Sequence, residues 1–417
     1  MRPGTYLAIV LGIAAALVCA VLAVNLRLDP FGLAAPAAAS AVDGVAEGAR
    51  PGAFWRKALS VREAKPRTVI LGTSRAEFGL DPRHPGFTAQ FQPVLNLALG
   101  ALSIEQIRLL LIHADTGSPL STAIIGLDME SFLDSGRPDF DPASLEGNPE
   151  SEPESLARLR IGLSREAFAA NFAHIFEPQP ASEARADAIG RREWRLTDEV
   201  LRSWEGQRGL IWTAEYDNFH GRLPLLFPQG RSALNWGADR KRVAAMASFR
   251  ELLHYANTHG IEVRMFVSPV HARYLEWYRR VGWWVLYESW KRALVETIEI
   301  ETQFAPGRAN FALWDFGGFH SISTEPVPQL GDLRTRMRWY RDTSHYAPEV
   351  GDMVLDRVLG KSELEVSALP GRRLDRAALE GDLSAIRLAA SKYRQAEPEE
   401  SANLDEMVMY LRRVSKR

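Results

Sequence analysis

The chain has 417 residues, of which 46% are hydrophobic and 24% charged, and its formal net charge is −2. These values are typical of a globular protein, and the near-neutral charge argues against a nucleic-acid partner. A single cysteine excludes an intrachain disulfide, so the fold must depend on its core. No phosphate-binding loop, zinc cluster or dinucleotide fingerprint occurs in the expected context, so we predict neither a metal nor a cofactor.

The amino-terminal segment 1–27 has the pattern of a membrane anchor. Its residues Tyr6–Val24 form an uncharged apolar run whose length suits the hydrocarbon core of a bilayer. A cleaved signal peptide is the alternative, because small residues at 34–41 resemble a cleavage site, but they lie well beyond the run. We favour an uncleaved single-pass anchor, a linker over 28–55, and a main domain in the periplasm or otherwise outside the cytoplasmic membrane.

From residue 56 to 365, short apolar runs alternate with longer helical patterns. This alternation is typical of an α/β fold in which a parallel sheet carries helices on both faces. The predicted strands are Thr68–Leu71, Val94–Leu99, Ala123–Leu127, Val263–Val267 and Phe311–Phe316. The predicted helices are Ile104–Ala114, with Ser103 at its start, Lys241–Thr258, Leu275–Thr302 and Pro348–Leu359.

Two further parts interrupt and follow this domain. Residues 134–239 form an insertion too long for a plain loop, and we expect a largely helical cap. Residues 366–417 are an extension with two amphipathic helices, Leu374–Tyr393 and Asn403–Arg413, which either pack back on the domain or bind a partner. Aromatic side chains in the later part of the insertion either pack the cap, which is the favoured interpretation, or stack on sugar rings. They are Trp194, Trp204, Trp212, Tyr216, Phe219, His220 and Trp236.

A serine and a histidine far apart in the sequence stand in settings that suit nucleophilic catalysis. Ser74 lies in a Gly-Thr-Ser-Arg turn directly after the first predicted strand, and His345 follows Asp342 by three residues. A serine nucleophile, a histidine base and an orienting carboxylate are the parts of a serine triad. Both segments should reach the carboxyl edge of a parallel sheet, where ligands bind. The sequence therefore predicts acyl chemistry at this edge.

Four short blocks lie at or after predicted strand ends: Gly72-Thr73-Ser74-Arg75, Val94-Leu95-Asn96-Leu97, Ile125-Gly126-Leu127-Asp128 and Asp342-Thr343-Ser344-His345. Together they resemble the SGNH/GDSL hydrolase superfamily. The resemblance is to a membrane-anchored bacterial branch similar to the D-alanyl transfer protein of teichoic acid modification and to polysaccharide O-acetylation proteins. It implies a flavodoxin-like parallel-sheet sandwich, with Ser74 as nucleophile, His345 as general base and Asp342 as the residue that orients the imidazole. It also implies a multi-pass membrane O-acyltransferase as a partner.

The resemblance also implies donors for an oxyanion. The backbone amide of Ser74 is the first, and an amide of Gly100 or Ala101 is the second. The third donor of the family is an asparagine after the next strand, where this chain has Asp128, a carboxylate that repels an oxyanion unless it is protonated or turned away. Asn96 is a possible substitute, although bracing the strand end is the more ordinary role for it. Loss of one donor slows catalysis by about 100- to 1000-fold, so either a slow enzyme or a non-catalytic relative follows.

Three more polar residues near predicted strand ends are candidates for substrate contacts. Arg75 could hold an anionic group beside the nucleophile, although a surface or helix-capping arginine is more common. His271 follows the fourth strand and either contacts substrate or caps the next helix, and capping is favoured. Asp315 ends the fifth strand and either belongs to the site or makes a structural hydrogen bond.

The expected function is that of a serine-dependent ester hydrolase or O-acyltransferase. It would act on a cell-envelope glycan or related polyol through an acyl-serine intermediate. The membrane tether and the resemblance favour transfer over hydrolysis. The alternative is an inactive SGNH-like module that binds glycan or scaffolds a membrane acylation complex. The complete Ser/His/Asp set favours the enzyme, and the missing asparagine favours the alternative.

Overall fold

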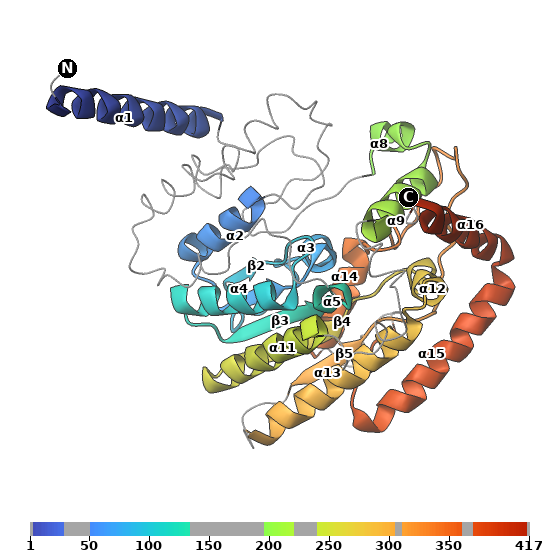
Figure 1. Ribbon diagram of the computed structural model, residues 1–417. Coiled ribbons are helices and arrows are strands. Elements are labelled where there is room, and N and C mark those ends of the chain that lie inside the picture. The colour runs from blue at the N-terminus through green and yellow to red at the C-terminus, as the bar shows by residue number, and fades with distance from the viewer. Residues whose placement is uncertain are drawn as a thin grey trace.

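The computed structural model describes residues 3–28, 51–133, 196–220, 240–304, 311–360 and 370–414 of the chain. Its centre is a six-stranded sheet in the order β2-β1-β3-β4-β5-β6 (Figure 1). The strands β1 to β5 pair in parallel, and β6 pairs antiparallel with β5. The prediction of an α/β fold with a mostly parallel sheet is therefore confirmed. The strands are β1 Thr68–Leu71, β2 Val94–Asn96, β3 Thr122–Leu127, β4 Glu262–Val267, β5 Ala312–Asp315 and β6 Arg372–Arg373.

Helices occupy most of the remaining described chain. One of them, α4, begins as predicted, because Ser103 and Gln106 form a reciprocal capping box at its amino end. The helices are α1 Pro3–Leu28, α2 Pro51–Ala64, α3 Ser74–Gly79, α4 Ile104–Gly117, α5 Glu130–Leu133, α8 Asp198–Ser203, α9 Gln207–His220, α11 Arg240–Thr258, α12 Ala272–Arg280, α13 Trp284–Phe304, α14 Pro348–Val358, α15 Arg376–Ala396 and α16 Pro398–Val414.

Alternate side chains of the strands enter two hydrophobic clusters on opposite sides of the sheet. In β1, Val69 and Leu71 belong to the cluster that includes residues of α4, α11 and α13. The residue between them, Ile70, belongs to the cluster that includes residues of α3 and α14. A strand covered on both sides is apolar at nearly every position, and the apolar runs in the sequence reflect this double burial.

The predicted anchor lies in α1. Its stretch Gly4–Asn25 has 22 residues and is long and apolar enough to cross a membrane, by length and composition. At 1.5 Å per residue such a helix is about 33 Å long, close to the thickness of a hydrocarbon core. A signal sequence meets the same criterion, so an uncleaved anchor and its orientation stay predictions.

The predicted start of the domain at residue 56 is wrong. Helix α2 begins at Pro51, inside the predicted linker, and its Phe54 and Val61 are buried in the same cluster as α4. Lys57 of α2 also forms a buried ion pair of 3.1 Å with Glu77 of α3. The Pro-Gly pair at 51–52 looks like the end of a linker, but proline is favoured in the first turn of a helix. The rest of the predicted linker, residues 29–50, lies outside the described residues.

The single helix predicted over Leu275–Thr302 is also wrong. The segment forms two helices, α12 and α13, and the chain turns between them at Gly282 with φ +83°, a conformation that glycine adopts without strain. Its tryptophans Trp277, Trp283 and Trp290 are buried, so this aromatic segment is part of the core. The second predicted strand also ends three residues early, at Asn96, and β6 escapes prediction because a pair of arginines carries no strand pattern.

The described part of the insertion packs on the domain together with the carboxyl-terminal extension. Helices α9 and α16 lie side by side at one end of the molecule (Figure 1). Phe219 of α9 stacks on Trp277 with ring centroids 4.5 Å apart, which is packing, whereas Trp212 and Tyr216 line a hollow of about 410 Å³ against Tyr410 of α16. Helices α15 and α16 contribute to the main cluster, so the extension packs back on the domain. Two of the singled-out aromatic residues, Trp194 and Trp236, lie outside the described residues.

Candidate active site

The nucleophile candidate is the first residue of α3, directly after a tight turn from β1. Gly72 in this turn has φ +144°, and a Cβ there would lie 3.0 Å from the carbonyl oxygen of Gly126, so a larger residue would be strained. Thr73 is the helix N-cap, and its hydroxyl accepts a hydrogen bond from the amide of Arg75. The turn leaves Ser74 half-buried at the carboxyl end of β1.

Helix α3 packs against α14, the helix that follows the histidine loop, and the contact depends on two glycines. A Cβ on Gly351 would lie 1.7 Å from the carbonyl oxygen of Gly79, and a Cβ on Gly79 would lie 1.9 Å from the ring of Tyr346. Any larger residue at these positions would push the helices apart. Ser74 and His345 are 271 positions apart in the sequence, and this close approach brings their two segments together.

The three residues predicted to be catalytic form one hydrogen-bonded chain. Nε2 of His345 is 2.8 Å from Oγ of Ser74, and Nδ1 is 2.7 Å from Oδ2 of Asp342. Oδ1 of Asp342 accepts hydrogen bonds from the backbone amides of Ser344 and His345, at 2.8 and 3.0 Å. The ring of Phe78 meets the imidazole edge-on, with centroids 5.3 Å apart. The spatial arrangement that the sequence predicts is therefore present, and with Nδ1 as donor to the carboxylate, Nε2 accepts from the serine.

The carboxylate of Asp342 is buried but remains ionised. Burial acts to raise its pKa, but the charge and hydrogen bond of His345, the charge of Arg341 and the amide of Ser344 outweigh burial and lower the pKa to about 2. The group is therefore negative at neutral pH. An ionised carboxylate at Nδ1 stabilises the imidazolium that forms when Nε2 takes a proton.

Asp128 stands where the resembled family has an asparagine, and its oxygens are held by other side chains. Its Oδ1 accepts from Nη1 of Arg75 at 2.8 Å, and its Oδ2 accepts from Oγ1 of Thr73 at 2.5 Å. Arg75 also donates to both oxygens of Glu130 at 3.3 Å and to Oγ of Ser344 at 3.2 Å. The prediction of a surface or substrate-binding arginine is therefore wrong, because Arg75 is buried and its donors serve internal partners.

Asn96 braces the end of β2. Its Nδ2 donates to the carbonyl oxygens of Ala76 and Leu80, both at 3.0 Å, and its Oδ1 accepts from the amide of Ala98. Both amide protons are thus used, so the proposal of Asn96 as an oxyanion donor is wrong and the bracing role is confirmed.

Gly100 lies beside the nucleophile. A Cβ on Gly100 would lie 3.7 Å from Cβ of Ser74, whereas the neighbouring Ala101 is exposed and has φ +59°. The amides of Ser74 and Gly100 donate no hydrogen bond to the part of the chain that the structure describes. Two unpaired N–H groups at the serine are therefore candidates for oxyanion donors.

The two remaining candidates have structural roles. His271 is fully buried and caps α12, since its Nδ1 accepts from the amide of Arg273 at 3.2 Å, while its Nε2 donates to the carbonyl of Glu325 at 2.7 Å. Capping is therefore confirmed over substrate contact. Asp315 forms a buried ion pair of 2.6 Å with Lys291 and accepts from the amide of Gly317, which is the structural alternative.

Acid should destabilise the protein through His271. Burial lowers the pKa of His271 to about 4, whereas its unfolded value lies near 6.5, so the unfolded state takes up the proton first as the pH falls. The contribution of His271 to the free energy of unfolding is therefore complete above pH 6.5, and it declines towards pH 4 by up to about 3 kcal/mol. We expect His271→Asn, which can still cap the helix, to reduce the decline measured by denaturant unfolding at pH 4 to 8. Burial also lowers the pKa of His320 to about 4, so a part of the decline should remain. The exposed control His259→Asn should keep the full parental decline, and equal slopes for both variants would contradict the assignment to His271.

The buried charged residues around the histidine loop are absent from the sequence-based predictions. They include Glu130, which also accepts hydrogen bonds from Tyr274 and Tyr278, and the pair Glu215 and Arg273. A charged residue inside an apolar or aromatic stretch is the only local signal for such a role. Each of these residues lies in such a stretch, but the sequence does not show which distant residue neutralises its charge.

The arrangement supplies a hydroxyl nucleophile, a base in contact with it, an ionised carboxylate behind the base, and two backbone N–H groups beside the serine. These are the kinds of group that acyl transfer through a serine ester uses. Among the residues that the structure describes, no group of three or more histidine, cysteine, aspartate or glutamate side chains could hold a metal ion.

The chain matches no model of a known protein family, and no curated protein is significantly similar to it.

Proposed function

We propose that the protein is a membrane-anchored, serine-dependent O-acyltransferase or ester hydrolase of SGNH type, acting on a cell-envelope glycan or related polyol. The observation that carries the proposal is the contact chain from Oγ of Ser74 through His345 to Asp342, with distances of 2.8 and 2.7 Å. The parallel sheet with Ser74 after β1 and His345 before α14 is in keeping with an SGNH sandwich.

The reaction would proceed in two halves. His345 takes the hydroxyl proton as Oγ of Ser74 attacks the ester carbonyl, and the resulting oxyanion collapses to an acyl-serine while the leaving alcohol receives the proton from the imidazolium. In the second half His345 takes a proton from water or a sugar hydroxyl, which attacks the acyl carbon. The bond to Ser74 then breaks, and the serine oxygen takes the proton back. Hydrolysis and transfer differ only in which hydroxyl reaches the intermediate.

Charge on the oxyanion would be stabilised by the amides of Ser74 and Gly100. Helix α3 has only six residues, so the serine amide itself contributes more than the helix dipole. The ion pair with Arg75 neutralises Asp128, which lessens the repulsion that a carboxylate at this position would otherwise exert. With two donors in place of three, turnover about 100- to 1000-fold below that of a complete site would follow.

Transfer to a glycan is the favoured form of the reaction. A membrane-spanning α1 would keep the domain beside a multi-pass acyltransferase that supplies the acyl group, whereas a free esterase has no need of a tether. The replacement of the third donor by Asp128 favours one alternative, an inactive SGNH-like module that binds glycan within an acylation complex.

Covalent labelling of Ser74 tests the proposal. The full chain in detergent should react with a fluorophosphonate probe, with the adduct mapped to Ser74 by mass spectrometry, because only an activated serine attacks phosphorus readily. Ser74→Ala should lose the label, and Ser289→Ala, which removes a hydroxyl from α13, should keep it. An oligosaccharide acceptor added to an acetyl-ester assay would divert acyl groups from water if the enzyme transfers them. Equal labelling of Ser74→Ala, or none under conditions where a known serine esterase reacts, would favour the binding module.

A further inference from the structure

Helix α9 of the insertion holds the backbone of the histidine loop. Gln207 is fully buried, and its Nε2 donates to the carbonyl oxygens of Tyr340 and Arg341, both at 2.8 Å. Its Oε1 accepts from the amide of Met337 at 2.7 Å. One side chain thus fixes three backbone groups that lead into Asp342.

Two turns further along α9, Glu215 holds the next part of the same loop. Its Oε1 accepts from Oγ1 of Thr343 at 2.9 Å, and the carbonyl oxygen of Thr343 accepts from the amide of His271 at 3.0 Å. Thr343 lies between Asp342 and Ser344, and it is 1% exposed. Its side chain is therefore held from α9, and its backbone is held by His271, the N-cap of α12.

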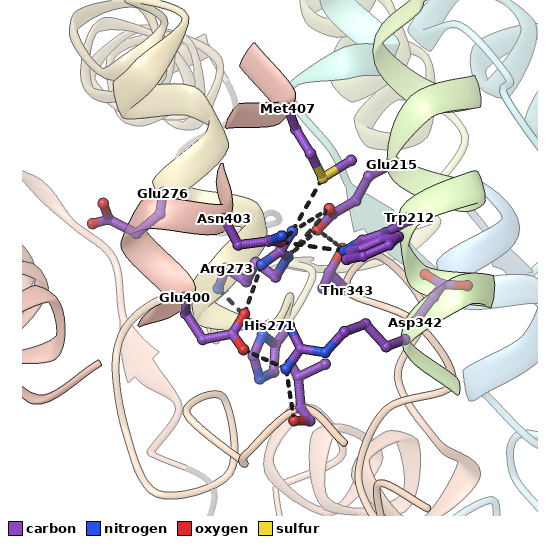
Figure 2. Close-up of polar contacts among 12 residues, drawn as sticks. Trp212, Glu215, His271, Arg273, Glu276, Asp342, Thr343, Glu400, Asn403 and Met407 are labelled. Carbon is purple, nitrogen blue, oxygen red and sulfur yellow. Dashed lines mark hydrogen bonds and ion pairs between the residues drawn. The ribbon is translucent and has the colours of Figure 1, made fainter. Parts of the chain in front are cut away.

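Glu215 is itself held by a buried set of ion pairs that reaches the carboxyl-terminal helix. Arg273 donates from Nε to Glu215 at 2.9 Å and from Nη1 to Glu400 of α16 at 2.6 Å. Figure 2 shows the arginine between the two glutamates. Glu400 also accepts from Arg208 at 2.5 Å, so two arginines balance two glutamates. Arg273 has no exposed side-chain surface. Burial acts to lower the pKa of Arg273, but Glu215 and Glu400 outweigh it and raise the pKa, so the pairs stay charged.

More partners from α16 complete the environment of the arginine. Nη2 of Arg273 donates to Oδ1 of Asn403 at 2.8 Å and contacts Sδ of Met407 at 3.3 Å (Figure 2). The same oxygen of Asn403 accepts from Nε1 of Trp212 on α9. Truncating any one charge of such a set leaves a buried charge without its partner, which is strongly unfavourable, so its members hold one geometry.

We propose that Glu215, anchored by Arg273 and by Glu400 of the carboxyl-terminal extension, is a positioning residue for the triad. The inference rests on the proposed function. The amides of Ser344 and His345 hold the carboxylate of Asp342 in position. A displacement of Thr343, which lies between these residues, therefore moves the carboxylate and the imidazole together. A shift of about 1 Å in reacting groups lowers rates by about 100-fold. The insertion and the extension are thereby part of the active-site scaffold.

The link is tested at Thr343 in the full chain in detergent. Thr343→Val keeps the shape and removes the donor to Glu215, so we expect kcat for an acetyl ester to fall by about 10- to 100-fold with KM nearly unchanged. Thr343→Ser restores a hydroxyl and should return most of the rate. The matched control Thr297→Val, which removes a hydroxyl bonded within α13, should keep the parental rate.

Two further measurements separate positioning from mere stabilisation and from a failure of the proposed function. Glu400→Gln should also lower kcat. Glu399 is an exposed neighbour in the same turn of α16, and Glu399→Gln should leave kcat unchanged. Hydrogen exchange at the amides of Ser344 and His345 should quicken in Thr343→Val, and this readout needs no activity. If the parental protein is inactive but exchange still quickens, only the catalytic proposal fails. The positioning role would be overturned if Thr343→Val and Glu400→Gln kept the parental kcat and the parental exchange rates while their melting temperatures fell.

Discussion

Asp342→Asn is expected to lower kcat for ester hydrolysis by about 10⁴-fold while the protein stays folded. The aspartate accepts three hydrogen bonds, from Nδ1 of His345 and from the amides of Ser344 and His345. An asparagine has one acceptor oxygen, and if that oxygen keeps the two backbone amides, its NH₂ group faces Nδ1. The imidazole then carries its proton on Nε2, towards Ser74, and cannot accept the serine proton.

A matched control separates this effect from a general effect of the substitution. Oδ1 of Asp332 likewise accepts from two backbone amides, those of Arg334 and Thr335, but no histidine among the described residues contacts it. Asp332→Asn should therefore leave kcat close to parental. Melting temperatures of both variants should show that each is folded. If Asp342→Asn retained a rate within tenfold of the parental rate, the carboxylate would have no orienting role and the triad would be refuted.

Arg75→Met is expected to destabilise the protein by about 3–5 kcal/mol. Arg75 is the cation between two buried carboxylates, Asp128 and Glu130, and the substitution removes the counter-charge that it supplies to both. Burial acts to lower the pKa of Arg75, but Asp128 and Glu130 outweigh it and hold the pKa well above its usual value. The measurement is the free energy of unfolding from denaturant titration followed by tryptophan fluorescence.

Arg83→Met is the control for that experiment, because Arg83 pairs with Asp81 at 3.0 Å but its side chain is 63% exposed. Exposed pairs contribute about 0–1 kcal/mol, so the control should stay within that range. Adding Asp128→Asn to Arg75→Met should recover part of the lost stability, since it removes one of the two like charges. A loss below 1 kcal/mol for Arg75→Met would mean that water or proton uptake already neutralises the carboxylates.

The fold was predictable wherever burial left a local pattern. The strands β1 and β3 are buried at every position, and β4 and β5 are buried over their later or alternate positions, so the apolar runs stand out in the sequence. The elements without such a pattern are the ones that prediction missed. Strand β6 is a pair of arginines at the sheet edge, α2 follows a Gly/Ala-rich stretch, and the break between α12 and α13 depends on one glycine.

The roles of single polar residues were predictable only where their partners are close in the sequence. Asn96 braces the end of its own strand, and His271 caps the helix that follows it. Each role includes a hydrogen bond to a backbone amide two residues further along the chain. Arg75 was misassigned because its partners Asp128 and Glu130 lie more than fifty residues away. No local rule indicates which of two distant charged residues will meet in the core.

By itself the sequence determined the apolar amino-terminal helix, the parallel sheet and the local pair of Asp342 and His345, because each depends on neighbouring residues and on periodic burial. Only the tertiary structure decided that Ser74 meets His345, since that contact depends on the close approach of Gly79 and Gly351 between α3 and α14. It also decided that the insertion and the extension support the same loop. Contacts between distant segments depend on how whole elements pack, and packing of this kind leaves no pattern along the chain.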